Sequence, residues 1–238
     1  MIQLPQLETF RFRFPPVAEA LDEPNGLLAF GGDLRPGRLL AAYRQGIFPW
    51  YDESQPILWW SPDPRAVLYP DQIHISRSLR RALNRSTFRM SMDQDFAGVI
   101  NGCAERSSTW ITQEMRDAYI QLHALGHAHS VEVWDEDHLV GGLYGVAIGR
   151  IFYGESMFSR VTDASKIALV HLCGQLRRWG FRVIDCQVGN DHTHSLGAIT
   201  ISRSEFVRLL TANTEEGNLA GTSPWQLQWF WRDDSTRP

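Results

Sequence analysis

Side chains able to bind and orient a charged ligand occur at two places within residues 150–187. Glu155 follows an aromatic, β-branched segment, and Asp185 and Gln187 lie near the end of a second segment of the same kind. A carboxylate makes charge-assisted hydrogen bonds to ammonium or guanidinium groups, and an amide can orient a carbonyl or an amine. We therefore expect a ligand site where these three side chains meet.

The sequence around these residues predicts a strand, a helix and a second strand. Residues 150–154 have strand composition, and residues 181–188 follow the same pattern. Between them, Thr162 or Asp163 can cap a helix that Gly180 ends. Such a crossover unit pairs two parallel strands, and ligands bind at the carboxyl ends of strands in sheets of this kind. The three polar side chains are thereby placed at one sheet edge.

Three antiparallel strands are expected upstream of the crossover helix, over residues 130–134, residues 139–148 and the segment from Arg150. Helices are expected before them. This order predicts an α/β (α+β) fold with an N-acetyltransferase-like mixed sheet. We assign this catalytic domain to residues 63–238 and a small N-terminal domain to residues 1–62.

The small N-terminal unit is rich in turns and aromatic residues. Residues 10–14 alternate like a short strand and stop at two prolines. Five aromatic side chains fall between Ile47 and Trp60 and cannot all point into so small a core. They form either a rigid wedge between the domains or a stacking platform for a base or another aromatic ligand.

The composition is that of a globular protein without a membrane segment. Of the 238 residues, 43% are hydrophobic and 21% charged, and the longest apolar run, residues 139–148, is too short to span a bilayer. The N-terminus lacks the basic and apolar regions of a secretory signal. Three cysteines without metal-type spacing fit a reducing cytosol, so we expect a cytoplasmic protein.

The formal net charge of −4 argues against a general nucleic-acid coat protein, although one local basic cluster exists. Between Ile73 and Met92 there is no acidic residue and there are five arginines: Arg77, Arg80, Arg81, Arg85 and Arg89. A solvated helix face is the commoner meaning of such a run. The alternative is a surface that contacts a nucleic-acid backbone.

A coenzyme A donor is disfavoured by the turn that begins the crossover helix. Acetyltransferases of this fold bind the cofactor pyrophosphate there on a glycine-rich turn, through backbone amides and the helix dipole. The corresponding residues 156–163 contain no glycine. A different acyl carrier is therefore expected.

Six motifs identify a candidate for that carrier. They are residues 25–34 (NGLLAFGGDL), 43–50 (YRQGIFPW), 58–65 (LWWSPDPR), 109–112 (TWIT), 154–159 (GESMFS) and 185–192 (DCQVGNDH). Together they closely resemble the leucyl/phenylalanyl-tRNA–protein transferase family, in the same order along the chain. The likeness covers residues 10–200 and is weakest after Glu205. It implies an N-acetyltransferase-like catalytic domain, in agreement with the order of elements.

The resemblance implies a reaction between aminoacyl-tRNA and a protein. The family moves Leu or Phe, with Met as a further candidate, from Leu-tRNA or Phe-tRNA to proteins or peptides with N-terminal Arg or Lys. This marks the acceptor for N-degron-dependent proteolysis. The donor is an ester and the product an amide, so the reaction runs downhill, and we expect no metal, no coenzyme A and no other cofactor. We also expect a monomer that does not bind membranes.

By resemblance, Asp185, Gln187 and Asn190 belong to the catalytic centre. We expect Gln187 to orient the attacking amine or the ester carbonyl, and Asp185 to hold Gln187 and to favour the ammonium or its proton relay. Asn190 supports the same loop. About a tenth of a free α-amino group is already unprotonated at neutral pH, so positioning should matter more than a strong base. The alternative for Asp185 is a strand-end turn former.

Glu155 is the candidate for binding the cationic side chain of the acceptor. A carboxylate at a strand end can bond to either cation, and only guanidinium can bind it in bidentate fashion. The alternative is a surface strand terminus paired to Arg150 or Arg160.

The resemblance also implies which residues surround the aminoacyl-adenosine end of the donor. They are Tyr43, Trp50, Trp110, Tyr119, Leu143, Phe152, Gly154, Met157, Ser159, Leu172 and Leu176. A methionine suits a pocket that accepts both Leu and Phe, because its thioether side chain adapts. Taken alone, each apolar member is better explained as plain core. The arginine cluster is expected to contact the tRNA backbone.

Three other interpretations were weighed. A metal site could use Asp185, Cys186, Asp191, His192 and His194, but two histidines at i and i+2 in a loop are a weak signal and a turn explains them better. A small-molecule acyltransferase of the same fold is the second. A non-enzymatic module that binds tRNA or N-degrons is the third, and it predicts binding without turnover.

Overall fold

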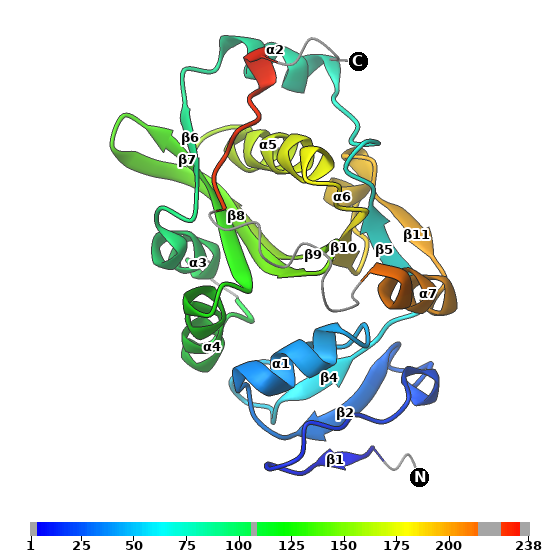
Figure 1. Ribbon diagram of the computed structural model, residues 1–238. Coiled ribbons are helices and arrows are strands. Elements are labelled where there is room, and N and C mark those ends of the chain that lie inside the picture. Colours follow the sequence, from blue (N-terminus) through cyan, green and yellow to red (C-terminus); the bar gives the residue numbers. More distant parts are fainter. Residues whose placement is uncertain (1–3, 106–108, 214–224, 234–238) are drawn as a thin grey trace.

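The computed structural model describes residues 4–105, 109–213 and 225–233, and these form a mixed α/β structure. The strands make one sheet of four and one of seven, both mixed (Figure 1). The smaller sheet uses residues 6–60 and the larger one residues 65–201. Buried residues of both parts nevertheless share one hydrophobic core. The division into domains of residues 1–62 and 63–238 therefore stays a prediction, whereas the α/β class is confirmed.

The seven-stranded sheet runs in the order β11-β5-β10-β9-β8-β7-β6. Its strands are β5 (Arg65–Leu68), β6 (Arg89–Met92), β7 (Ala128–Asp135), β8 (His138–Ile148), β9 (Ile151–Ser159), β10 (Val183–Gln187) and β11 (Ile199–Ile201). Strands β9 and β10 are parallel, and all other neighbours are antiparallel. Helix α5 (Ala164–Arg178) connects β9 to β10. The expected crossover unit and the antiparallel β7-β8-β9 meander are thus confirmed.

The four-stranded sheet runs in the order β1-β2-β4-β3 and packs against helix α1 (Pro36–Tyr43) (Figure 1). Its strands are β1 (Gln6–Leu7), β2 (Leu27–Gly31), β3 (Phe48–Pro49) and β4 (Leu58–Trp60). Only β1 and β2 are parallel.

The strand expected over residues 10–14 is wrong, because that segment has no strand structure. Buried Arg38 donates hydrogen bonds to the carbonyls of Thr9 and Arg11, at 3.2 and 3.0 Å. The Phe12 ring lies 5.2 Å from the same guanidinium. The backbone acceptors are therefore taken by an arginine side chain and not by a neighbouring strand.

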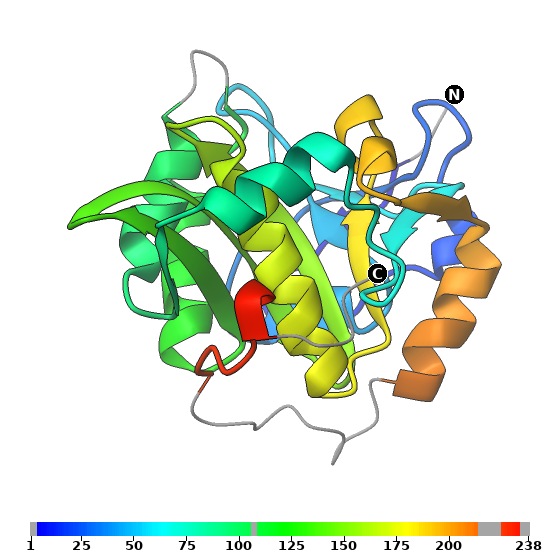
Figure 2. The same cartoon turned by 90° about the horizontal axis from the view of Figure 1, so that it is seen from above.

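Helices cover both faces of the large sheet (Figures 1 and 2). Helix α5 lies on one face, with α2 (Arg77–Arg85) beside it, and α3 (Phe96–Ala104) and α4 (Gln113–Ala124) lie on the other. The remaining helices are α6 (Asp191–Ser195), α7 (Arg203–Asn213), η1 (Val17–Glu19) and η2 (Trp231–Asp233). In the described ranges, none of them has the length and apolar character needed to cross a bilayer.

Side chains of β8 alternate between the two faces, as a pleated strand requires. Leu143 and Ala147 join the core beneath α5. Tyr144 and Val146 join the core shared by α1, α3 and α4. Tyr43 of α1 and Tyr119 of α4 belong to the same core, so they lie on this second face of the sheet.

Helix α5 is capped by a residue that lies before the expected one. Asp163 occupies the N-cap position with a φ of +64° but makes no capping bond, and its carboxylate instead accepts from Lys166 at 2.8 Å. The Ser165 backbone N–H donates to the Ser159 hydroxyl at 2.8 Å. The predicted Asp163 or Thr162 side-chain cap is therefore wrong, because the end of β9 supplies the acceptor. Gly180, with a φ of +77°, follows the helix end as predicted.

A β-bulge interrupts β9 in its middle. Tyr144 pairs with Ser156 and Gly145 pairs with Gly154, so Glu155 is the extra residue. Bulges re-aim side chains and are frequent beside active sites. The bulge thus gives Glu155 an orientation that regular pairing would not.

The close approach of the strands at this bulge makes Gly145 sensitive to substitution. In Gly145→Ala the new Cβ would lie 2.2 Å from the Tyr153 carbonyl oxygen, so the backbone must shift. We expect the free energy of unfolding to fall by about 1–3 kcal/mol. In the matched control Gly154→Ala the nearest atoms are 3.6 Å away, so stability should change little. Urea denaturation of both variants checks this, and equal losses would contradict the bulge geometry.

Candidate active site

The Glu155 carboxyl group is surrounded by three side chains from three other elements. The Tyr43 hydroxyl from α1 donates to Oε1 at 2.8 Å, and the Tyr119 hydroxyl from α4 donates to Oε2 at 2.9 Å. The Gln187 amide from β10 donates to Oε1 at 3.0 Å. The site therefore joins the N-terminal helix to the edge of the large sheet.

The two tyrosine hydroxyls also contact each other, and both residues are fully buried. A hydroxyl carries one proton, so two hydroxyls cannot donate in all three contacts among themselves and Glu155. A proton on Glu155 supplies the third donor, so that each of the three contacts can be a hydrogen bond. The arrangement thus favours a protonated Glu155 carboxyl group.

The raised pKa of Glu155 agrees with a protonated carboxyl group. Burial raises the pKa of Glu155 to about 7, and the hydrogen bonds from Tyr43, Tyr119 and Gln187 only partly oppose that rise. Burial also raises the pKa of both tyrosines well above the ordinary value, so they stay protonated donors. Glu155 therefore changes charge close to neutral pH.

A second bulge lies in β10, directly beside the first. Asp185 pairs with Val67 and Gln187 pairs with Ala66, which leaves Cys186 as the extra residue. Pairing between β9 and β10 ends at Asp185. Glu155 lies in the middle of β9 and not at a strand end as expected, whereas Gln187 does end β10. The two bulges still bring both residues to one point of the sheet, where the Gln187 amide reaches Glu155.

Asp185 is fully buried and is held by Arg65. The guanidinium donates to Oδ1 from Nε at 2.8 Å and to Oδ2 from Nη2 at 2.6 Å. Oδ1 also accepts the backbone N–H of Gln187 at 3.0 Å. Of the roles expected for Asp185, the geometry supports holding Gln187. Contact with a substrate ammonium is not supported, because both oxygens are already engaged away from solvent.

Asn190 and the residues after it form a loop that turns into a short helix. The Asn190 side chain accepts the backbone N–H of Thr193 at 2.9 Å and caps α6, where the sequence predicted a turn. Asn190 itself is exposed. Its support of the loop agrees with expectation, and a catalytic role stays a prediction.

Two of the residues expected to surround the aminoacyl group line a cavity of about 360 Å³. Met157 and Ser159 lie on its wall, together with His192, which belongs to the motif at residues 185–192 but is not among the expected site residues. Gly102 and Phe158 also line it, as do the polar residues Glu105, Arg160 and Ser165. The cavity lies at the carboxyl end of β9, where the crossover geometry predicts ligand binding.

The other apolar residues expected around the amino acid are buried between the sheet and α5. They are Leu143, Phe152, Leu172 and Leu176. Leu143 pairs with Met157 across the β8-β9 ladder. These side chains form the core behind Met157, and their contact with a substrate stays a prediction.

The two expected tryptophans differ in exposure. Trp50 is 47% exposed and packs edge-on against Trp60, with ring centroids 5.6 Å apart. Trp110 is half-buried against the core that contains Tyr119. Trp50 thus keeps accessible ring surface, as a stacking platform needs, and is not locked into an interdomain wedge.

The arginine cluster is divided by its aromatic neighbours. The Arg80 guanidinium lies 5.8 Å from the Trp231 ring, and Arg89, in β6, lies 4.8 Å from the Trp134 ring. The other three are exposed on α2: Arg77, Arg81 and Arg85. Arg89 is also exposed, so the solvent-facing part of the cluster comprises the α2 surface and Arg89.

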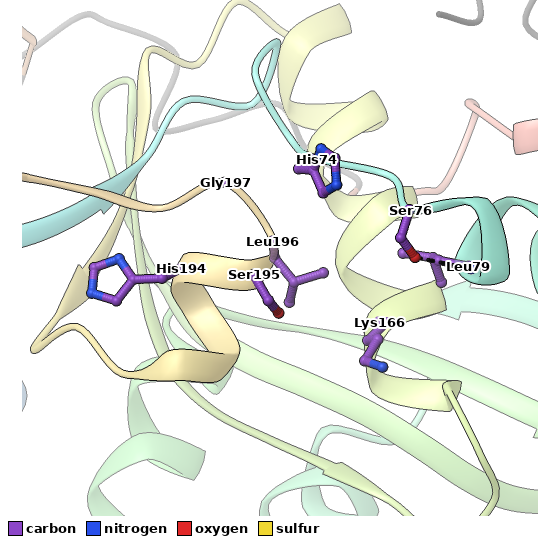
Figure 3. A pocket seen from close by; sticks show the side chains of 8 residues that line it. All are labelled: His74, Ser76, Leu79, Lys166, His194, Ser195, Leu196 and Gly197. Atoms are coloured by element: carbon purple, nitrogen blue, oxygen red, sulfur yellow. Dashed lines mark hydrogen bonds between the residues drawn. The ribbon is translucent and has the colours of Figure 1, made fainter.

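A larger cavity of about 670 Å³ lies beside the start of α2 (Figure 3). Ser76 and Leu79 line it from α2, and His74 and Lys166 contribute basic groups. His194 points away from the other side chains in Figure 3. No residue of the predicted catalytic centre lines this cavity, so it is distinct from the Glu155 site.

Among the described residues, Asp93, His123 and His129 offer ligand atoms within 4.8 Å of one another. The ring nitrogens near Asp93 are already engaged, because His129 Nδ1 lies 2.7 Å from Asp93 and His123 Nδ1 lies 2.8 Å from the Ala128 carbonyl. The group is accounted for as a histidine–carboxylate hydrogen-bond network. The expectation that no metal takes part stays a prediction.

Titration of Glu155 should appear in the pH dependence of stability. Between its ordinary pKa of 4.5 and its folded pKa of about 7, the folded chain keeps a proton that the unfolded chain loses. The free energy of unfolding of the natural chain, relative to Glu155→Gln, should therefore fall by up to about 3 kcal/mol as pH rises through this window. Denaturation of both proteins at several pH values measures it, and parallel pH curves would contradict the assignment.

Comparisons with known proteins agree with the resemblance. Residues 67–211 match the Leucyl/phenylalanyl-tRNA protein transferase family, and residues 32–63 match the N-terminal domain of that family. The chain is 57% identical over 211 residues to the leucyl/phenylalanyl-tRNA–protein transferase of Stutzerimonas stutzeri, covering 87% of this chain and 93% of the relative. It is 50% identical over 238 residues to the leucyl/phenylalanyl-tRNA–protein transferase of Cellvibrio japonicus, and the alignment covers 98% of this chain and 99% of the relative.

Among solved structures, L-PGS from Bacillus licheniformis aligns with 68% of this chain and 53% of its own, at 11% identity and a TM-score of 0.38. That similarity is too low to support an argument about the fold. The matched family covers the segments that carry Tyr43, Glu155 and Gln187. The chain belongs to the leucyl/phenylalanyl-tRNA–protein transferase family, whose members transfer aminoacyl groups from tRNA to proteins.

Proposed function

We propose that this enzyme transfers Leu or Phe, with Met as a further candidate, from aminoacyl-tRNA to the α-amino group of proteins that begin with Arg or Lys. The transfer marks these proteins for N-degron-dependent proteolysis. The observation that carries the proposal is the Glu155 carboxyl group, held by Tyr43, Tyr119 and Gln187 at the sheet edge. Such a group is suited to bind a cationic acceptor end.

The reaction needs little chemical assistance. The acceptor nitrogen attacks the ester carbonyl and a C–N bond forms. The C–O bond to the tRNA ribose then breaks, and the ribose oxygen takes the proton that the nitrogen loses and becomes a hydroxyl. We propose that Gln187 orients the amine or the ester carbonyl, that Asp185 holds Gln187, and that Asn190 supports the loop. Positioning of two reactants can supply about 7–11 kcal/mol of barrier reduction. We propose that the chain uses no metal and no cofactor.

Recognition of the acceptor is assigned to Glu155. A guanidinium or ammonium group that approaches the carboxyl favours its ionised form and lowers its pKa. The ionised carboxylate can accept bonds from the cation while Tyr43 and Tyr119 keep donating to it. The alternative ion pair with Arg160 is disfavoured, because that guanidinium bonds to Glu105 at 2.7 Å.

We assign the donor end to the surface from Trp50 to the cavity at Met157. Trp50, Trp110, Tyr43 and Tyr119 would surround the terminal adenosine and the amino acid, and we assign Gly154 to the same surface. Stacking on a base is worth about 1–3 kcal/mol. The cavity lined by Met157 and Ser159 would take the amino-acid side chain, with Leu143, Phe152, Leu172 and Leu176 as its supporting core.

The tRNA backbone is assigned to the exposed α2 surface. Arg77, Arg81 and Arg85 face solvent there, and α2 has no acidic residue. His74 and Lys166 in the adjoining cavity add basic groups beside it. Phosphate contacts of this kind are largely independent of tRNA sequence.

The fold and setting complete the proposal. The parallel β9-β10 pair with its crossover helix, next to an antiparallel meander, supports an N-acetyltransferase-like catalytic domain. The three cysteines are free, which fits a reducing cytoplasm. A monomeric state is also proposed.

A direct assay offers labelled Leu-tRNA or Phe-tRNA together with peptides that begin with Arg, Lys or Ala. We expect label on the Arg and Lys peptides only, because Ala gives Glu155 no cation to bind. Release of free amino acid without peptide labelling would contradict protein-directed transfer. Binding of tRNA without any turnover would instead support the non-enzymatic alternative.

Salt dependence tests the α2 surface. Replacing Arg77 and Arg81 together by Glu should weaken donor binding and reduce the slope of log Kd against log salt by roughly two. The control pair Arg178→Glu and Arg182→Glu makes the same charge change at exposed positions outside α2 and should leave the slope unchanged. Equal slopes for the α2 variant and the natural chain would place the tRNA elsewhere.

A further inference from the structure

Arg65 is a buried cation that bonds to both sides of the active site. It begins β5, is 1% exposed, and its guanidinium lies 4.9 and 4.6 Å from the ring centroids of Phe48 and Phe206. In that position it is closed off from solvent. Its effect on substrates must therefore pass through the residues to which it bonds.

On one side, Arg65 acts on Gln187 through Asp185. Two nitrogens of the guanidinium take both Asp185 oxygens, and Asp185 in turn accepts the Gln187 backbone N–H at 3.0 Å. Gln187 has a φ of +58°, an unfavourable region for a residue with a side chain. The bond from Asp185 holds this conformation, in which the Gln187 amide reaches Glu155 at 3.0 Å.

On the other side, Arg65 acts on the helix that carries Tyr43. Its Nη1 donates to the Gly46 carbonyl at 3.0 Å, and the Gly46 N–H donates to the Tyr43 carbonyl at 3.0 Å. Tyr43 is the last residue of α1, and its hydroxyl donates to Glu155. Both branches from Arg65 therefore end at the same carboxyl group.

We propose that Arg65 is a positioning residue for aminoacyl transfer, because it fixes Gln187 and the end of α1 against Glu155 from opposite sides. The proposal rests on the proposed function. A planar guanidinium can make the bidentate bond to Asp185 and still reach Gly46, whereas a lysine ammonium is a single point of charge. Arg65→Lys therefore keeps the buried charge balanced and loosens only the geometry.

The test is a double-mutant cycle in the full-length protein, with Arg65→Lys, Gln187→Ala and both together. We expect Arg65→Lys to lower kcat by about 10- to 100-fold through Gln187 and to raise KM for the Arg peptide through Tyr43 and Glu155. In the Gln187→Ala background Arg65→Lys should cause little further loss of kcat, because both substitutions act on Gln187, whereas the rise in KM for the Arg peptide should persist because it passes through Tyr43. If the double variant lost kcat by the product of the two single-variant losses, the proposal would be overturned.

Arg38→Lys is the matched control. Arg38 is also fully buried and paired with a carboxylate, Asp33, but it lies near the start of α1 and bonds to backbone carbonyls within residues 8–11. Thermal unfolding should show a loss of stability, while kcat per folded enzyme stays unchanged. Should Arg65→Lys fail to fold, Asp185→Asn weakens the same Arg65–Asp185 pair. Combined with Gln187→Ala, it must then lower kcat by little more than Gln187→Ala alone. Absence of transfer by the natural chain would overturn the proposed function itself, whereas transfer with multiplying losses overturns only the Arg65 assignment.

Discussion

A carboxyl group taken out of water is stable only when it is protonated or bonded on several sides, and Glu155 meets this constraint with neighbours from three elements. Two of its donors, Tyr43 and Tyr119, are 76 residues apart in the sequence and fully buried. The N-terminal helix α1 therefore has to pack against α4 and the sheet for the site to exist. The small sheet, which packs behind α1, is thus part of the active site's support.

The bulges in β9 and β10 and the buried Arg65–Asp185 pair both serve to orient Glu155 and Gln187 toward each other. Regular pleating would alternate Glu155 and its neighbours between two faces of the sheet, whereas the bulges give Glu155 and Gln187 a common orientation. Asp185 holds the left-handed backbone of Gln187, and Arg65 neutralises Asp185. A buried pair of this kind is weak evidence for stability. Its placement is better explained by the precision that the site requires.

The sequence predicts those parts of the structure that depend on local signals. Strand composition, the glycine at the end of α5 and the meander pattern lie within short windows, and each is found in the structure. The Arg65–Asp185 pair joins residues 120 apart and has no local signal. The strand expected over residues 10–14 is wrong for the same reason, since the distant Arg38 bonds to the carbonyls of Thr9 and Arg11. The division of the arginine cluster likewise depends on tryptophans from other parts of the chain.

The central claim is that the Glu155 carboxylate recognises the positive charge of the acceptor. The most direct measurement compares KM for two peptides, one beginning with Arg and one with its neutral isostere citrulline, in the natural enzyme and in Glu155→Gln. The account predicts a strong preference for Arg in the natural enzyme and loss of most of that preference in Glu155→Gln. An undiminished preference in the variant would show that the cation is read elsewhere and would contradict the account.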